Sequence, residues 1–187
     1  MAKRTGFSEK DLCTEIVNSL TAAGGFAFKI ADTAVSYQRE EGNRTRFSLP
    51  RAVDIIAIMQ GRGYAIEVKL KRDLGALKRT DIRQEQRNTL ARVGQAGGGA
   101  CLAVGYRFKC GPVQRRTVGA AYARELYLVK WPVWEALEAT EPDGVTRDAI
   151  RERGCVVAWL GGGLWDFDPA GECRREKILL DTMGGAG

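Results

Sequence analysis

Histidine is absent from all 187 residues of the chain. The protein therefore cannot use a Ser-His-Asp triad, a Cys-His pair or a histidine general base, because each of these mechanisms requires an imidazole group. No two cysteines form a CxxC pair, so the sequence does not favour a zinc site. Five cysteines are expected to be reduced and partly buried thiols: Cys13, Cys101, Cys110, Cys155 and Cys173.

Long apolar segments are also missing. No run approaches the ~20 apolar residues of a membrane span. The N-terminal sequence MAKRTGFSEKDL is basic and lacks the apolar centre of a signal peptide. We therefore expect a cytoplasmic protein with no membrane partner, and the length fits one domain or one domain with an elaboration.

Charge is unevenly distributed along the chain. The net charge of +6 is the balance of +1 in residues 1–59, +10 in residues 60–130 and −5 in residues 131–187. A basic middle beside a more acidic C-terminal part indicates a surface that faces a polyanion. The alternative is an ordinary solvated face on which cations happen to cluster.

The first 110 residues alternate between helical and strand patterns in a simple order. We expect helix, strand, strand, strand, helix and strand, with a polar loop or irregular hairpin at 31–51 and a basic connection at 71–80. This order predicts an α/β fold with a mixed central sheet flanked by helices. The expected elements are a helix within 8–25, strands at 26–30, 53–59 and 64–70, a helix at 81–93 and a strand at 100–108.

Residues 111–187 are expected to form an α+β extension packed on a core of residues 1–110, rather than a separate domain. Strands are expected at 124–130 and within 155–167, and helices at 131–139 and 147–154. Core packing, rather than base stacking, is the expected use of the four tryptophans, Trp131, Trp134, Trp159 and Trp165.

The stretch AVDIIAIMQGRGYAIEVKL, residues 52–70, reads as an apolar hairpin with three charges, Asp54, Glu67 and Lys69. Side chains alternate between the two faces of a strand, so Glu67 and Lys69 share a face. An even-length loop places Asp54 on that face too, opposite Lys69 and diagonal to Glu67. An odd-length loop would place Asp54 on the other face.

Two close carboxylates on a buried face repel each other unless positive charge neutralises them. Lys69 supplies one charge, and a divalent cation such as Mg²⁺ is a fitting source of the rest, because hard cations bind carboxylate and carbonyl oxygens. The alternatives are a structural ion-pair cluster and an exposed sheet face.

Each helix of the core sets a polar side chain within its apolar stripe. Glu9 lies near the centre of the stripe of the first helix, whereas Glu15 lies at its flank. In the second helix Gln86 falls on the apolar face, between Arg83 and Arg87. The alternatives are a helix-dipole role for Glu9 and a backbone-bonded, helix-edge position for Gln86.

Four stretches spanning about residues 8–108 resemble the PD-(D/E)xK nuclease superfamily. Within it they are most similar to the VRR-NUC group, and more distantly to archaeal-type Holliday junction resolvases. The stretches are SEKDLCTEIVNSLTAAGG with Glu9, RFSLPRAVDIIAI with Asp54, GYAIEVK with Glu67 and Lys69, and RQEQRNTLARVGQAGGGACLAV with Gln86. Val53 stands where the superfamily has proline, and Arg83 where the glutamine motif usually has serine.

The resemblance implies a restriction-endonuclease-like α-β-β-β-α-β core and a DNA endonuclease dependent on Mg²⁺ or Mn²⁺. It implies metal binding by Asp54, Glu67 and the carbonyl of Val68, while Glu9 would contact the metal through water or complete a second site. Lys69 would orient the attacking water or stabilise the transition state, and Gln86 would position Lys69 or contact DNA. The phosphate contacts would come from Lys71, Arg72, Lys78, Arg79, Arg83 and Arg87.

DNA is thus the expected partner, a homodimer is plausible, and the setting is a bacterial or phage-infected cell. Two alternatives stay open. One is a nucleic-acid-binding module that kept the nuclease fold without its activity, and the other is an unrelated α/β protein with a structural charge cluster.

Overall fold

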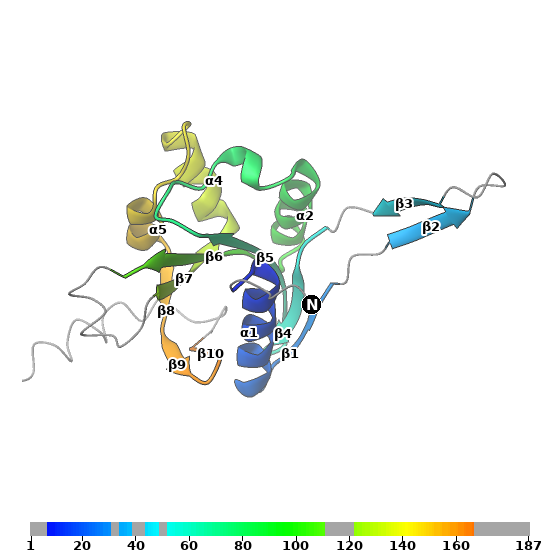
Figure 1. Ribbon diagram of the computed structural model, residues 1–187, viewed down its shortest axis with the longest axis horizontal. Coiled ribbons are helices and arrows are strands. Elements are labelled where there is room, and N and C mark those ends of the chain that lie inside the picture. Colours follow the sequence, from blue (N-terminus) through cyan, green and yellow to red (C-terminus); the bar gives the residue numbers. More distant parts are fainter. Residues whose placement is uncertain (1–6, 31–33, 39–43, 49–51, 111–121, 167–187) are drawn as a thin grey trace, which may run out of the picture.

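The computed structural model describes residues 7–30, 34–38, 44–48, 52–110 and 122–166. A six-stranded sheet lies between helices that cover both of its faces (Figure 1). The helices are α1 (Glu9–Ala22), α2 (Gln84–Gln95), α4 (Trp131–Thr140) and α5 (Arg147–Arg153), with a 3-10 turn, η1, at Arg79–Asp81. The strands are β1 (Phe26–Lys29), β2 (Ala34–Gln38), β3 (Arg44–Ser48), β4 (Ile55–Met59), β5 (Arg62–Lys71), β6 (Gly99–Lys109), β7 (Tyr122–Lys130), β8 (Cys155–Val157), β9 (Trp159–Gly161) and β10 (Leu164–Trp165).

The main sheet has the strand order β1-β4-β5-β6-β7-β8. Only β5 and β6 run parallel, and the other neighbours are antiparallel. A parallel pair requires a crossover connection, which here contains α2. The expected order of helix, three strands, helix and strand is confirmed by α1, β1, β4, β5, α2 and β6, and the mixed sheet flanked by helices agrees with the restriction-endonuclease-like core. The segment 31–51 contributes β2 and β3, which pair only with each other in the described residues.

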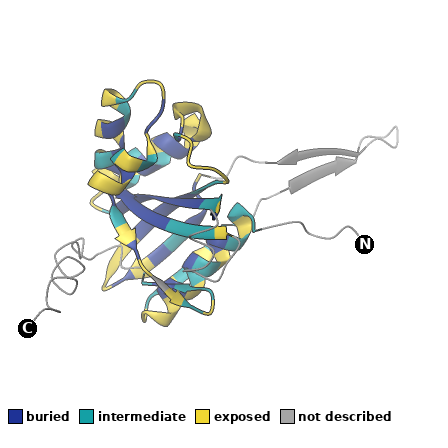
Figure 2. Ribbon diagram, turned by 60° about the vertical axis from the view of Figure 1, so that its left-hand side comes forward, coloured by how far each residue is buried: buried dark blue, intermediate teal, exposed yellow. Residues whose placement is uncertain are grey.

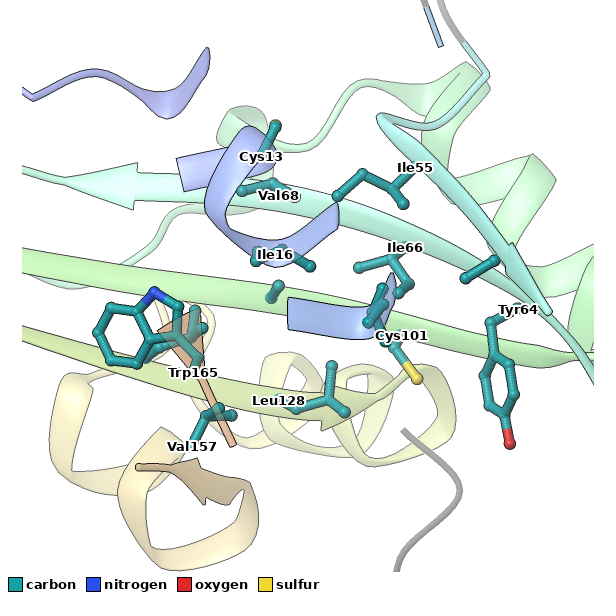
Figure 3. Close-up of a cluster of buried hydrophobic side chains, with 14 of the residues drawn as sticks. Cys13, Ile16, Ile55, Tyr64, Ile66, Val68, Cys101, Leu128, Val157 and Trp165 are labelled. Carbon is teal, nitrogen blue, oxygen red and sulfur yellow. The ribbon is translucent and has the colours of Figure 1, made fainter. Parts of the chain in front are cut away.

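Alternation along the strands gives the sheet two apolar faces. Leu12, Ile16 and Leu20 of α1 pack against one face, in one cluster with Ile66 and Val68 of β5. Figure 3 shows Ile16 near Ile66 and Val68. On the other face Leu90 of α2 and the residues of α4 pack over β6 and β7. The buried residues therefore gather along the central strands, as the dark blue segments in Figure 2 show.

The helix α1 begins with a reciprocal cap. The Asp11 N–H donates to the Ser8 hydroxyl oxygen, and the Ser8 N–H donates to the Asp11 carboxylate at 2.9 Å. This capping box satisfies N–H groups that the first turn leaves without helical partners. It fixes the start of the helix at Glu9 and holds that residue's side chain in the first turn, beside the end of β5.

The C-terminal extension continues the same sheet. β7 pairs with β6 along its whole length, from Tyr122 to Lys130, and β8 then pairs with β7. The expected packing role of tryptophan is confirmed for Trp131, Trp134 and Trp165, which are buried. Residues 111–121 and 167–187, including Cys173, lie outside the described residues, as does the side chain of Trp159.

Some element boundaries differ from the sequence prediction. The second helix starts at Gln84 rather than residue 81, because Arg79–Asp81 form a 3-10 turn and Ile82 is extended. Cys13, Cys101 and Cys110 are buried and Cys155 is partly buried, in agreement with the expected burial. No helix in the described part of the chain is long and apolar enough to cross a membrane.

Candidate active site

The β4–β5 hairpin turns in two residues, Gln60 and Gly61. Both have positive φ angles, 51° and 76°, as the tight turns that match strand twist require. The even loop length confirms the prediction that Asp54, Glu67 and Lys69 share one face. The predicted register is wrong by two residues, because the turn is centred on Gln60 and Gly61 rather than on Gly61 and Arg62. Ile56 pairs with Ala65, which sets Asp54 beside Glu67 rather than opposite Lys69.

Asp54 lies where the pairing of β4 with β5 ends. It immediately precedes β4 and is 3% exposed. The Val68 N–H donates to the Asp54 Oδ2 at 2.9 Å. This carboxylate oxygen replaces the backbone acceptor that β4, which begins at Ile55, does not provide. The Asp54 carbonyl accepts from the Ile30 N–H at 2.8 Å, so the residue is fixed from both neighbouring strands.

Glu67 is fully buried at the centre of the site. Its Oε1 accepts from Gln86 Nε2 at 2.5 Å and lies 2.8 Å from Lys69 Nζ. Its Oε2 is buried and finds no hydrogen-bond donor among the described residues. Burial, followed by the negative charge of Asp54, raises the pKa of Glu67 to about 8, although Lys69 opposes this. A proton on Glu67 can be shared with Asp54, and without that proton the two acids repel each other.

Gln86 orients Glu67 from the first turn of α2. Its Oε1 accepts from the Arg83 N–H at 3.0 Å, which directs Nε2 toward Glu67. Gln86 is 2% exposed, which confirms the prediction that it lies on the buried face of the helix. Gln86 thus contacts the carboxylate of Glu67 directly, whereas the sequence suggested that it positions Lys69 or contacts DNA.

Glu9 and Glu15 have different roles in the structure. Glu9 Oε2 accepts from the Leu70 N–H at 3.2 Å, two residues along β5 from the N–H that Asp54 accepts. Glu15 instead accepts from Trp165 Nε1 at 2.9 Å and pairs with Arg124 at 2.8 Å, which joins α1 to the C-terminal extension. Glu9 is therefore the α1 acid that faces the candidate site.

A divalent cation fits this set of oxygens. Within the described residues no three His, Cys, Asp or Glu side chains lie close enough together to hold a metal, so the carboxylates of the site are the pair Asp54 and Glu67. A strand residue's N–H and C=O point to the same side, so the Val68 carbonyl faces the edge on which Asp54 lies. The unpartnered Glu67 Oε2, an Asp54 oxygen and this carbonyl match the hard oxygen ligands that Mg²⁺ takes together with water.

Most of the expected phosphate-binding cations lie at the surface, along the connection from β5 to α2. Lys71 is partly exposed and lies 3.9 Å from Asp81. Arg72, Lys78, Arg79 and Arg83 are exposed.

Arg87 differs from these cations, because it is 7% exposed. Its guanidinium pairs with Glu138 of α4, and its Nε and Nη2 also donate to the carbonyls of Ile82 and Arg79. This burial argues against the predicted phosphate contact. The positions of Gln86, Arg87 and Leu90 on one helix face were a signal for burial that the sequence interpretation missed.

Of three comparisons with known proteins, the comparison with solved structures found matches. No family model and no curated protein matches the chain. Among solved structures, it is similar to Archaeoglobus fulgidus Hjc, a Holliday junction resolvase from an archaeal hyperthermophile. The identity is 22% and the TM-score is 0.41, over 78% of this chain and 90% of that one.

Replacing Arg87 tests its structural role. Arg87→Met is expected to lower the free energy of unfolding by about 3 kcal/mol, because it leaves the mostly buried Glu138 without its partner. Arg87→Met combined with Glu138→Leu should recover most of this loss. Denaturant unfolding measures both, and Arg83→Ala serves as an exposed control with an expected change below about 0.5 kcal/mol. An Arg87→Met protein of wild-type stability would contradict the assignment.

The pKa of Glu67 predicts a specific dependence of stability on pH. Because the folded state holds this proton more tightly than the unfolded chain does, its stabilising contribution is present below about pH 4.5 and is lost as pH rises to about 8. In EDTA, wild-type stability should fall over this window more steeply than that of Glu67→Gln, which keeps a polar side chain of equal size. Asp148→Asn, at an exposed carboxylate, should leave the slope unchanged. Equal slopes for wild type and Glu67→Gln would show that Glu67 titrates normally.

Proposed function

We propose that the protein is a divalent-metal-dependent endonuclease that hydrolyses phosphodiester bonds in DNA. The observation that carries the proposal is the buried Glu67 carboxylate, which has one oxygen without a donor, beside Asp54 and within 2.8 Å of Lys69. A purely structural ion pair has no use for a second buried acid, because that acid raises the cost of ionising Glu67.

Each residue of the site has a defined part in this proposal. Asp54, Glu67 and the Val68 carbonyl hold Mg²⁺ or Mn²⁺, and Gln86 keeps the Glu67 carboxylate in its orientation. When bound there, the cation would lower the pKa of a coordinated water molecule and would place positive charge at the scissile phosphate. The Lys69 ammonium orients that water or stabilises the charge that develops on the phosphate.

Glu9 and the exposed cations complete the proposed substrate site. Glu9 accepts from the backbone of β5 next to the acids, in a position to contact the cation through water. Lys71, Arg72, Lys78, Arg79 and Arg83 bind DNA phosphates, with an affinity that falls steeply with salt. The resemblance of the four motifs to the VRR-NUC group supports structure-specific cleavage and a phage or mobile-element type of enzyme, with a homodimer as a plausible form.

Substitution of the acids and the lysine tests the proposal. Asp54→Asn, Glu67→Gln and Lys69→Met should each lower the cleavage rate by at least about 100-fold, because each removes a group that acts on the reacting phosphate. The substrates are plasmid, linear duplex, flap, fork and four-way junction DNA, each with Mg²⁺, Mn²⁺ or EDTA. Glu85→Gln on the exposed face of α2 and Asp148→Asn are matched controls that keep full activity.

Two results would contradict this account in different ways. Cleavage at the wild-type rate by Glu67→Gln would show that the active site lies elsewhere in the protein. Binding of DNA by the wild type, with no cleavage of any substrate under any metal, would instead favour the inactive nucleic-acid-binding module.

Metal binding can be measured without activity. Mn²⁺ or Mg²⁺ should raise the midpoint of thermal unfolding, because a cation that binds only the folded state stabilises it. The rise should be larger at about pH 9 than at about pH 6, since protons compete with the cation for Glu67, whose pKa is about 8. Glu67→Gln should lose most of this rise while Asp148→Asn keeps it. A cation effect that is independent of both pH and Glu67 would contradict the assigned ligands.

A further inference from the structure

An exposed apolar patch lies beside the candidate active site. It consists of Phe26 and Phe28 of β1 and Ile58 of β4, which are 63%, 46% and 50% exposed. The two phenylalanine rings have centroids 5.9 Å apart and planes inclined at 55°. The patch is therefore a pair of neighbouring aromatic rings on a strand, with an aliphatic side chain next to them.

The register places this patch on the same sheet face as the catalytic candidates. Phe26 pairs with Ile58 and Phe28 with Ile56, while Ile56 pairs with Ala65 across the hairpin. Ile56 is two residues from Asp54, which corresponds to about 7 Å along a strand. Phe28 thus lies in the row of side chains next to the row that contains Asp54 and Glu67.

Helices leave this corner of the face open. β1 is an edge strand of the sheet, beside β4 (Figure 1). On this face α2 packs over β5 and β6, and α4 over β6 and β7, whereas α1 covers the opposite face of β1. A Cβ atom built at Gly63, in the row of Phe26 and Ile58, would meet no atom within 4 Å, so nothing among the described residues lies over that position.

The charges around the patch suit a polyanion. On the face of the patch β5 contributes the cations Lys69 and Lys71, whereas the acids of that face, Asp54 and Glu67, are buried. Two copies of such a surface would bring like charges together, which disfavours a second copy as the occupant. A nucleic acid strand offers phosphates for the cations and flat bases for the rings.

We propose that Phe26, Phe28 and Ile58 form a stacking platform for unpaired bases of the DNA strand that enters the active site. The inference rests on the proposed function and names its substrate class, DNA with single-stranded or splayed bases. Bases within a duplex are already stacked on their neighbours, so the platform adds little to the affinity for duplex DNA. Stacking next to Asp54 holds an unpaired strand with its backbone near the reacting phosphate.

The test compares binding of single-stranded and duplex oligodeoxynucleotides in EDTA, where no cleavage occurs. Phe26→Leu/Phe28→Leu keeps an apolar surface but removes the rings, and should weaken single-strand binding by about tenfold or more while leaving duplex binding within about twofold. Phe26→Trp/Phe28→Trp should retain single-strand binding. Val156→Ala, at the opposite edge strand β8 and 48% exposed, is the matched surface control.

Two further measurements complete the test. The midpoint of thermal unfolding confirms that the leucine variant is folded, which is expected for exposed positions, and light scattering gives its oligomeric state. Unchanged single-strand affinity would overturn the platform, and so would loss of a dimer in the leucine variant, since the patch would then join two copies. If the wild type cuts no DNA but the leucine variant still loses single-strand affinity, the platform stands and the proposed hydrolysis fails.

Discussion

The burial of Glu67 is the constraint around which the site is built. A carboxylate with no exposure, a negative neighbour and one oxygen without a donor is unfavourable when ionised, and this raises its pKa to about 8. Gln86 and Lys69 satisfy only the other oxygen. The Oε2 of Glu67 has no donor among the described residues, and on the proposed function a divalent cation would supply the positive charge that it lacks.

The fold supplies the geometry through the unequal lengths of two strands. β5 extends beyond β4, so the N–H groups of Val68 and Leu70 lack a strand partner and are taken by the carboxylates of Asp54 and Glu9. The parallel pairing of β5 with β6 requires a crossover, and the helix in that crossover brings Gln86 to Glu67. Helices α1 and α2, on opposite faces of the sheet, thus both contribute side chains that hydrogen-bond to β5 at one site.

Sequence patterns predicted the core fold and the clustering of Asp54, Glu67, Lys69 and Gln86, because strand alternation and helix periodicity depend only on local spacing. The register could not be predicted, since GRG allows several turns and the positive φ of Gln60 is decided by the strand twist. The burial of Arg87 had a local signal, the helix face that it shares with Gln86 and Leu90, but its partner Glu138 is fifty-one residues away and has none. The exposed patch around Phe28 was also missed, because a short apolar strand gives no indication of which face a helix leaves open.

The central claim is that the buried acid pair is a cation site. Crystals of the protein soaked in Mn²⁺ would test it most directly, through the anomalous scattering of the metal. The account predicts a single strong peak in contact with Asp54, Glu67 and the Val68 carbonyl, which disappears in Glu67→Gln crystals. An ordered site with no peak between these groups, or a peak elsewhere that Glu67→Gln leaves unchanged, would contradict it.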